Sequence, residues 1–98
     1  MAAVQYQGDK ARPLVEEAVV LARQVGDPDT LAQAYEAHGV TFTFAIGDMD
    51  VARGDFEQSR AFFEQAGDRG GMAITVGNLG VVEGFCKNYE LTLRHLKV

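Results

Sequence analysis

The stretch Gln24-Val25-Gly26-Asp27 and its counterpart Gln65-Ala66-Gly67-Asp68 decide the fold of this chain. Glycine takes the left-handed backbone conformation that ends a helix at little steric cost. The aspartate that follows can accept hydrogen bonds from the free N–H groups at the start of the next helix. Gly8-Asp9 and Gly47-Asp48 are steps of the same kind, and Lys87-Asn88 is a weaker one. The sequence therefore predicts helices joined by very short turns, so that consecutive helices are antiparallel neighbours.

The sequence also repeats itself, because Gly67 follows Gly26 by 41 residues and the similarity extends on both sides. The identical pairs at this offset are Asp9 and Asp50, Ala11 and Ala52, Arg12 and Arg53, Glu16 and Glu57, Ala32 and Ala73, Gly39 and Gly80, Val40 and Val81, and Phe44 and Phe85. A period in this range is typical of repeat arrays, in which no unit can bury its apolar face alone.

Turn signals and the spacing of apolar residues predict five helices. Their expected ranges are 9–25, 28–46, 49–66, 69–86 and 89–98. In the first helix, Leu14, Ala18, Leu21 and Val25 form one apolar stripe, which we expect to face inward. Pro13 belongs either to the first turn of this helix or marks its start at Arg12.

Two further features belong to the later helices. Gly54-Asp55 falls at the matching place in the third helix and predicts a frayed or kinked first turn there. The fourth helix carries glycines at positions 70, 71, 77, 80 and 84, and each interior glycine costs about 1 kcal/mol relative to alanine. The six phenylalanines have helical spacing and are predicted to be core residues.

Composition limits the class of protein. Ninety-eight residues with 47% hydrophobic and 23% charged side chains make one globular domain, 1–98. A net charge of −5 and nine scattered basic residues argue against nucleic acid and anionic membranes as partners. The sequence shows neither a signal peptide nor an apolar stretch of the roughly 20 residues that cross a bilayer. Cys86 is the only cysteine, which fits a reducing compartment, so we expect a cytoplasmic protein.

The segments Asn78-Leu79-Gly80 and Asn88-Tyr89 resemble the "NLG…GNY" segment of tetratricopeptide repeats. In the preceding copy, His38-Gly39 and Gly47-Asp48-Met49 occupy these places, with one residue inserted. Ala52, Phe56 and Ser59 follow at the small and aromatic positions of the family's second helix. The 41-residue unit is longer than the common form of about 34 residues, and is similar to the long repeats of large bacterial regulators and scaffold proteins.

This resemblance implies an all-α fold: a short right-handed solenoid of two to two and a half antiparallel helix pairs. In the family, the first helix of each pair lines a concave groove that binds peptides. By resemblance, the groove residues here are Gln33, Glu36, Val40 and Thr43 from one repeat, and Ile74, Gly77, Asn78 and Val81 from the next. Asn78 stands where family members bind a peptide main chain; the alternatives are that it caps a neighbouring helix or faces solvent. A weakly acidic, apolar groove favours an apolar or basic ligand segment.

No residue pattern indicates catalysis or a bound cofactor. His38 lies on an apolar stripe and is interpreted as a packed core residue, and one cysteine with two histidines makes no zinc site. Glu16 and Glu17 are adjacent, so they point in different directions on a helix and cannot act as an acid–base pair. The sequence thus predicts a non-enzymatic module with a protein or peptide partner.

Neither end of the predicted array has an obvious polar cap. We therefore expect the chain either to be a piece of a longer array or to cover its ends by self-association. Self-association defines the alternative function, an oligomerisation module that pairs with other copies through its terminal helices.

Overall fold

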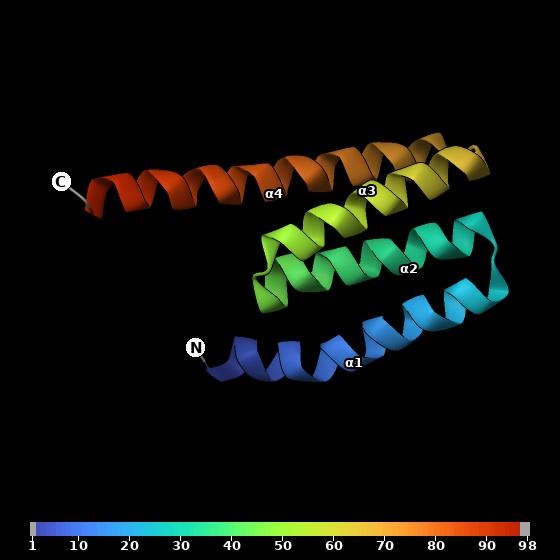
Figure 1. The fold of residues 1–98 in the computed structure, drawn as a ribbon, viewed down its shortest axis with the longest axis horizontal. Coiled ribbons are helices and arrows are strands. Elements are labelled where there is room, and N and C mark those ends of the chain that lie inside the picture. Colours follow the sequence, from blue (N-terminus) through green and yellow to red (C-terminus); the bar gives the residue numbers. More distant parts are fainter. Residues whose placement is uncertain (1, 97–98) are drawn as a thin grey trace.

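The protein is all-helical over the part of the chain that the structure describes. This computed structural model describes the backbone of residues 2–96 and the side chains of residues 9–91 and 93–96. The elements are α1 (Ala2–Val25), α2 (Pro28–Thr41), a π-helical segment η1 (Phe42–Ile46), α3 (Met49–Ala66) and α4 (Arg69–Leu96) (Figure 1). The predicted fold class is confirmed at this level, although four α-helices replace the expected five.

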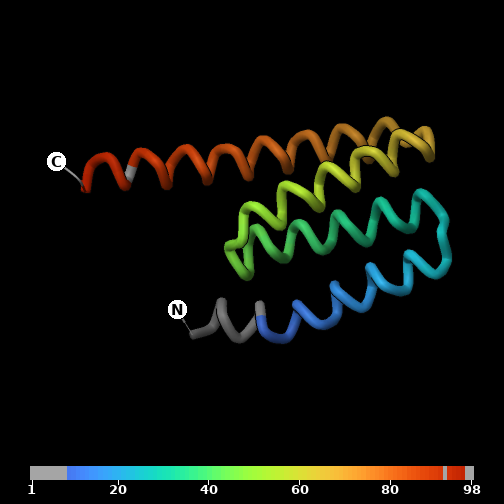
Figure 2. The backbone as a smooth tube through the Cα atoms, viewed as in Figure 1, coloured from blue at the N-terminus to red at the C-terminus, as the bar shows by residue number. Residues whose placement is uncertain are grey.

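The helices lie side by side in chain order, with α1 and α4 at opposite edges (Figure 1). Each packs on the helix that follows it: α1 on α2, α2 on α3, and α3 on α4. The direction of the chain reverses at each turn (Figure 2), so sequential neighbours are antiparallel as predicted. The Cα atoms span 50 × 28 × 16 Å, which is an elongated, flat array.

The Gly-Asp steps end and restart three of these helices. Gly26, Gly47 and Gly67 have φ values of 77°, 86° and 71°, in the left-handed region. The side chains of Asp27, Asp48 and Asp68 each accept a hydrogen bond from the backbone N–H three residues later, at 3.1, 3.2 and 2.9 Å. Helix termination and capping therefore come from the local chemistry that the sequence predicts.

Two of the predicted helix boundaries are wrong. Gly8-Asp9 and Pro13 both lie inside α1, and α4 runs without a break through Lys87-Asn88 and Tyr89. Lys87-Asn88 has no glycine to adopt the left-handed conformation, so continuing the helix keeps the backbone hydrogen bonds. Gly54-Asp55 is likewise inside the continuous helix α3.

The expected helix over 28–46 changes its winding after Thr41. In η1 the N–H of Gly47 bonds to the carbonyl of Phe42, five residues back, at 2.8 Å. A π-helical turn holds one more residue than the α-helical hydrogen-bonding pattern. It lies in the Gly39–Met49 stretch, where the sequence comparison placed an insertion, and it changes which side chains face outward beyond residue 41.

The core consists of two clusters. Val19, Ala22, Leu31 and Ala34 pack between α1 and α2. Phe42, Ala52, Phe56 and Val82 form the second cluster, which joins η1, α3 and α4. Together these clusters hold neighbouring helices in contact along the array.

The apolar stripe predicted to face inward on α1 points the other way. Leu14, Leu21 and Val25 are 68%, 51% and 67% exposed, whereas Val19 and Ala22 are buried. The reason is that α1 has two apolar faces, and its neighbour α2 covers only the face that carries Val19 and Ala22. Leu14, Leu21 and Val25 therefore form an open apolar edge of the array.

Candidate functional site

The predicted binding residues fall on α2, η1 and α4, and two contacts, one from α2 and one from η1, reach α4 across one face of the array. The Asn78 side-chain N–H donates to the Glu36 carboxylate at 3.4 Å. The rings of Phe44 and Phe85 meet edge to face, with centroids 6.1 Å apart. We call this surface the α2–α4 face; its residues are Gln33, Glu36, Val40, Phe44, Ile74, Asn78, Val81 and Phe85.

Apolar side chains dominate the α2–α4 face. The exposed fractions are 37% for Val40, 57% for Phe44, 59% for Ile74, 41% for Val81 and 42% for Phe85. Val40 and Phe44 are four positions apart, and Val81 and Phe85 follow Ile74 by seven and eleven positions, so on α4 these side chains follow one side of the helix. Large apolar side chains gathered on one surface and open to solvent are typical of a site that another polypeptide covers.

Glu36 and Asn78 provide the polar centre of this face. Both are half-buried, and burial raises the pKa of the Glu36 carboxyl above its ordinary value because the charged form loses hydration. The bond to Glu36 uses one of the two N–H groups of Asn78, whose amide oxygen is a hydrogen-bond acceptor.

Three of the predicted groove residues differ in how they contribute to this face. Thr43 was predicted to lie in the groove, but it is buried and its hydroxyl donates to the Gly39 carbonyl at 2.7 Å. The wider turn of η1 rotates Thr43 inward and brings Phe44 to the surface instead. Gln33 is exposed at one end of the face, where its amide donates to Asp29 at 2.9 Å. Nothing lies within 4 Å of the Cβ position of Gly77, which leaves the surface open there.

Sequence reasoning missed Phe44 and Phe85 as surface residues and assigned both to the core. Their 41-residue offset was the available signal, because Val40 and Val81 share it and lie on the same face. Helical spacing of a phenylalanine does not by itself reveal whether another helix covers its face. Phe42, Phe56 and Phe63 are buried core residues as predicted, and Phe62 is half-buried against the cluster between α1 and α2.

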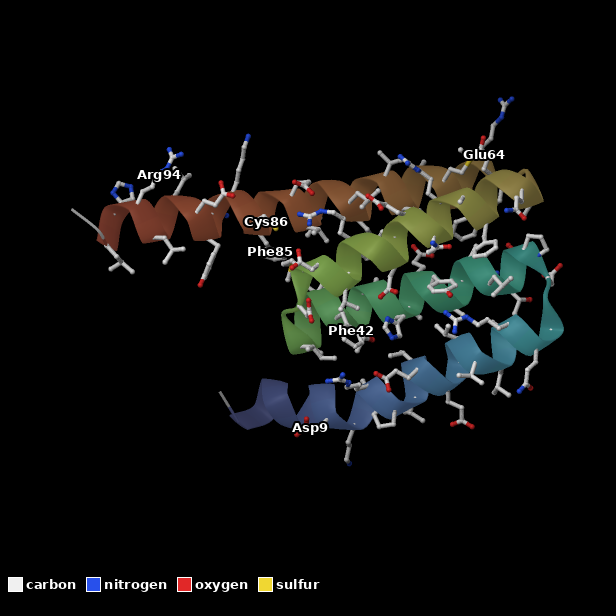
Figure 3. All side chains as sticks on the ribbon, in the orientation of Figure 1. Asp9, Phe42, Glu64, Phe85, Cys86 and Arg94 are labelled. Carbon is white, nitrogen blue, oxygen red and sulfur yellow. The ribbon has the colours of Figure 1, made fainter. Side chains whose placement is uncertain are left out.

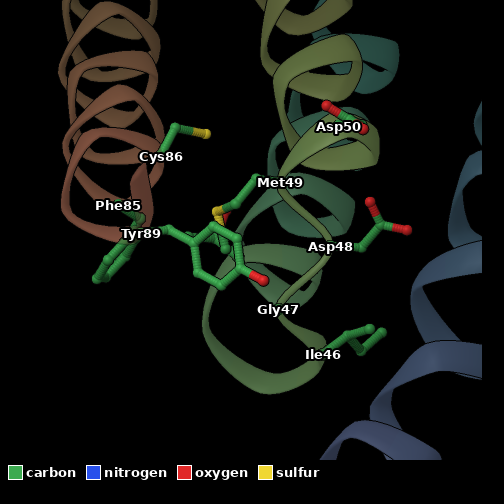
Figure 4. Close-up of a pocket in the computed structure, with 9 residues that line it drawn as sticks. Ile46, Gly47, Asp48, Met49, Asp50, Phe85, Cys86 and Tyr89 are labelled. Atoms are coloured by element: carbon green, nitrogen blue, oxygen red, sulfur yellow. The ribbon is translucent and has the colours of Figure 1, made fainter. Parts of the chain in front are cut away.

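A cleft of about 700 Å³ continues from the α2–α4 face at Phe85. It forms because α4 extends past the η1–α3 turn (Figure 2), leaving a space between the two. Phe85 and Cys86 of α4 (Figures 3 and 4) and Tyr89 (Figure 4) line one side. The lining on the other side includes Ile46, Asp48, Met49 and Asp50 (Figure 4). The charged residues of this lining are both acidic, as is Glu36 on the neighbouring face.

His38 and Asp55 form a second polar group, inside the array. The imidazole Nδ1 shares a hydrogen bond with the Asp55 carboxylate, and the imidazole ring stacks on Phe42 with centroids 4.4 Å apart. Burial raises the pKa of Asp55, and the hydrogen bond to His38 opposes that rise. His38 is therefore packed as predicted, with Asp55 as a partner that the sequence did not suggest.

A small hollow lies beside this pair, and its lining also includes Glu16, Val19, Val20, Arg23 and Tyr35. The Tyr35 hydroxyl accepts from the Arg23 guanidinium at 2.6 Å. No group of three or more potential metal ligands occurs among the described residues.

Comparison with protein-family models, with curated proteins and with solved structures found no match. No described helix combines the length and the apolar character that spanning a bilayer requires. The tetratricopeptide-like grouping therefore rests on the sequence resemblance alone.

Proposed function

We propose that this chain is a non-enzymatic protein-interaction module that binds a polypeptide segment on its α2–α4 face. The observation that carries the proposal is the group of exposed apolar side chains around the Glu36–Asn78 hydrogen bond. A tetratricopeptide-like solenoid is part of this proposal. In such a solenoid α2 and α4 would be the first helices of successive pairs, and the first helices line the groove in tetratricopeptide repeats.

The ligand that fits this surface combines apolar and basic side chains. Apolar groups would cover Val40, Phe44, Ile74, Val81 and Phe85, which supplies binding free energy through burial. A lysine or arginine would interact with Glu36, or with Asp48 and Asp50 in the adjoining cleft. The amide oxygen of Asn78 can accept a hydrogen bond from the segment's main chain, which would fix its register. The acidic balance of the chain and its single cysteine favour a cytoplasmic setting.

The proposal is tested by panning a phage-displayed random peptide library on the immobilised chain. We expect enrichment of sequences that join apolar residues to lysine or arginine. The Phe85→Asp variant should no longer bind the enriched peptides, and Asn78→Ala should bind them more weakly. The reason is that central contact residues contribute about 2 kcal/mol or more to binding. Glu57→Ala, at an exposed position of α3, is the matched control and should retain them. Equal enrichment on the Phe85→Asp variant would rule out this face as the site.

A further inference from the structure

The two edges of the array are open apolar surfaces that correspond to a contact already formed in its interior. At the 41-residue offset, α1 matches α3 and α2 matches α4. In the interior, α3 packs on α2. The matching faces of α1 and α4 are not covered by another helix among the described residues.

The interior contact is made by a few defined residues. Asp55 of α3 bonds to His38 of α2, and the ring of Phe62 stacks with that of Tyr35 at 5.9 Å. A third contact is made by the Ser59 hydroxyl, which donates to the backbone carbonyl of Ala32 at 2.8 Å. The face of α3 that meets α2 is thus marked by residues 55, 59 and 62.

On α1 the residues that correspond to this face are Leu14, Ala18 and Leu21. Leu14 and Leu21 are 68% and 51% exposed, and Ala18 is half-buried. The polar Asp55 and Ser59 are thus replaced by apolar side chains at the edge. The edge helix α1 thus presents an apolar version of the face that α3 packs on α2.

On α4 the residues that correspond to His38, Tyr35 and Ala32 are Leu79, Val76 and Ala73. Val76 is 53% exposed, Ala73 is exposed and Leu79 is half-buried. Each correspondence therefore pairs an apolar residue of α1 with an apolar residue of α4: Leu14 with Leu79, Leu21 with Val76, and Ala18 with Ala73.

The glycines of α4 fit the same arrangement. In the interior, the Phe56 ring fills the space over Gly39, where a Cβ would lie 2.7 Å from the ring. Gly80 corresponds to Gly39, is exposed, and has nothing within 4 Å of its Cβ position. The same is true of Gly84, one turn further along. These glycines leave room for the backbone of a neighbouring helix to approach closely.

We infer that the edges bind each other: α1 of one copy packs on α4 of a second copy, in the geometry with which α3 packs on α2. The occupant is a second copy, because both halves of the contact are present on this chain and their residues match in register. The contact is head to tail, so each addition leaves a new α1 edge and a new α4 edge. Because its residues are not those of the α2–α4 face, stacking is independent of peptide binding and would extend that face along the assembly.

The test uses two variants that each disable one edge. Leu21→Asp places a charge on the α1 edge and Val76→Asp places one on the α4 edge; both sites are about half exposed, so the folded chain is expected to persist. Circular dichroism checks the fold of each variant. Ala61→Asp, at an exposed position on α3, is the matched control and should associate like the wild type.

Sedimentation equilibrium should show a wild-type mass that rises with concentration, and each edge variant alone should remain monomeric. Mixing the two variants should give a dimer and nothing larger, because one intact α1 edge meets one intact α4 edge. A monomeric wild type at millimolar concentration would overturn the inference. So would a mixture that remains monomeric, because it would lack the α1–α4 contact. An edge variant that still associates on its own would also overturn the inference, since that result indicates a symmetric contact between like edges.

A third variant tests the role of the open space over Gly80. Gly80→Gln keeps a helix-forming residue but fills that space, so it should weaken wild-type association about tenfold or more. Unchanged association of this variant would contradict the proposed packing of α1 over Gly80. Peptide panning on the edge variants separates the two proposals. Stacking can fail while peptide binding on the α2–α4 face persists, and peptide binding can fail while stacking persists.

Discussion

The ring of Phe56 lies directly over Gly39, so that a Cβ at position 39 would be 2.7 Å from Cε1 of the ring. Phe56 is only 1% exposed and belongs to the central core cluster, so it has no space to move into. Gly39 is therefore required by packing, because α2 and α3 approach each other over this residue.

Gly39→Ala is expected to lower the free energy of unfolding by about 1 kcal/mol. Overpacking costs about 1–3 kcal/mol, and the better helix propensity of alanine returns about 1 kcal/mol. The corresponding Gly80→Ala variant has open space and should raise the free energy of unfolding by up to about 1 kcal/mol. Urea unfolding followed by circular dichroism, at a concentration where the chain is monomeric, measures both. Equal stability of the two variants would show that the contact with Phe56 has no energetic weight.

Asp55→Ala should destabilise the fold, because it leaves the half-buried His38 imidazole without its hydrogen-bonding partner between α2 and α3. Loss of a buried hydrogen bond to a charged group costs about 1.5–3 kcal/mol. The control Glu57→Ala changes an exposed position of the same helix and should stay within about 0.5 kcal/mol of the wild type. A loss no larger than that of the control would mean that packing alone holds α2 against α3.

The stability of the protein should depend on pH through Glu36. Burial raises its pKa in the folded chain above the ordinary value of 4.5, so the folded state holds the proton more strongly than the unfolded state. Its contribution is complete below the unfolded pKa and is lost as the pH rises through the folded pKa. Glu36→Gln should therefore gain stability relative to the wild type as the pH rises through the window just above 4.5.

Chemical denaturation at several pH values measures this difference directly. Asp55 titrates in the same direction but is present in both chains, so the comparison isolates Glu36. The measured quantity is the free energy of unfolding of Glu36→Gln minus that of the wild type. If this difference stays constant or falls as the pH rises, the result would contradict the burial of this carboxyl.

The helix ends could be predicted from sequence wherever local chemistry decides them. Gly26, Gly47 and Gly67 adopt the left-handed conformation, and the aspartates that follow cap the next helix. Lys87-Asn88 lacks that chemistry, and the expected break is absent. The predictable part of the fold is thus the part in which a residue and its immediate neighbours suffice.

The face that a residue occupies depends on what packs against it, and sequence periodicity does not contain that information. Leu14 and Leu21 form a regular stripe, yet α2 covers the other face of α1. At η1 the change of winding buries Thr43 and exposes Phe44, which exchanges a predicted binding residue for a predicted core residue. Asn78 and Glu36 were both expected on the binding surface, but the hydrogen bond between them depends on how closely α2 approaches α4.

The most direct test of the central claim is a backbone amide NMR titration of the chain with a peptide selected by panning. The proposed function predicts that the largest shift changes map to the α2–α4 face, at residues such as Val40, Phe44, Asn78 and Phe85. It also predicts small changes at the exposed α3 positions Glu57 and Ala61. Saturable binding with its largest changes on α3, or on the outer stripe of α1, would contradict the claim that α2 and α4 hold the ligand.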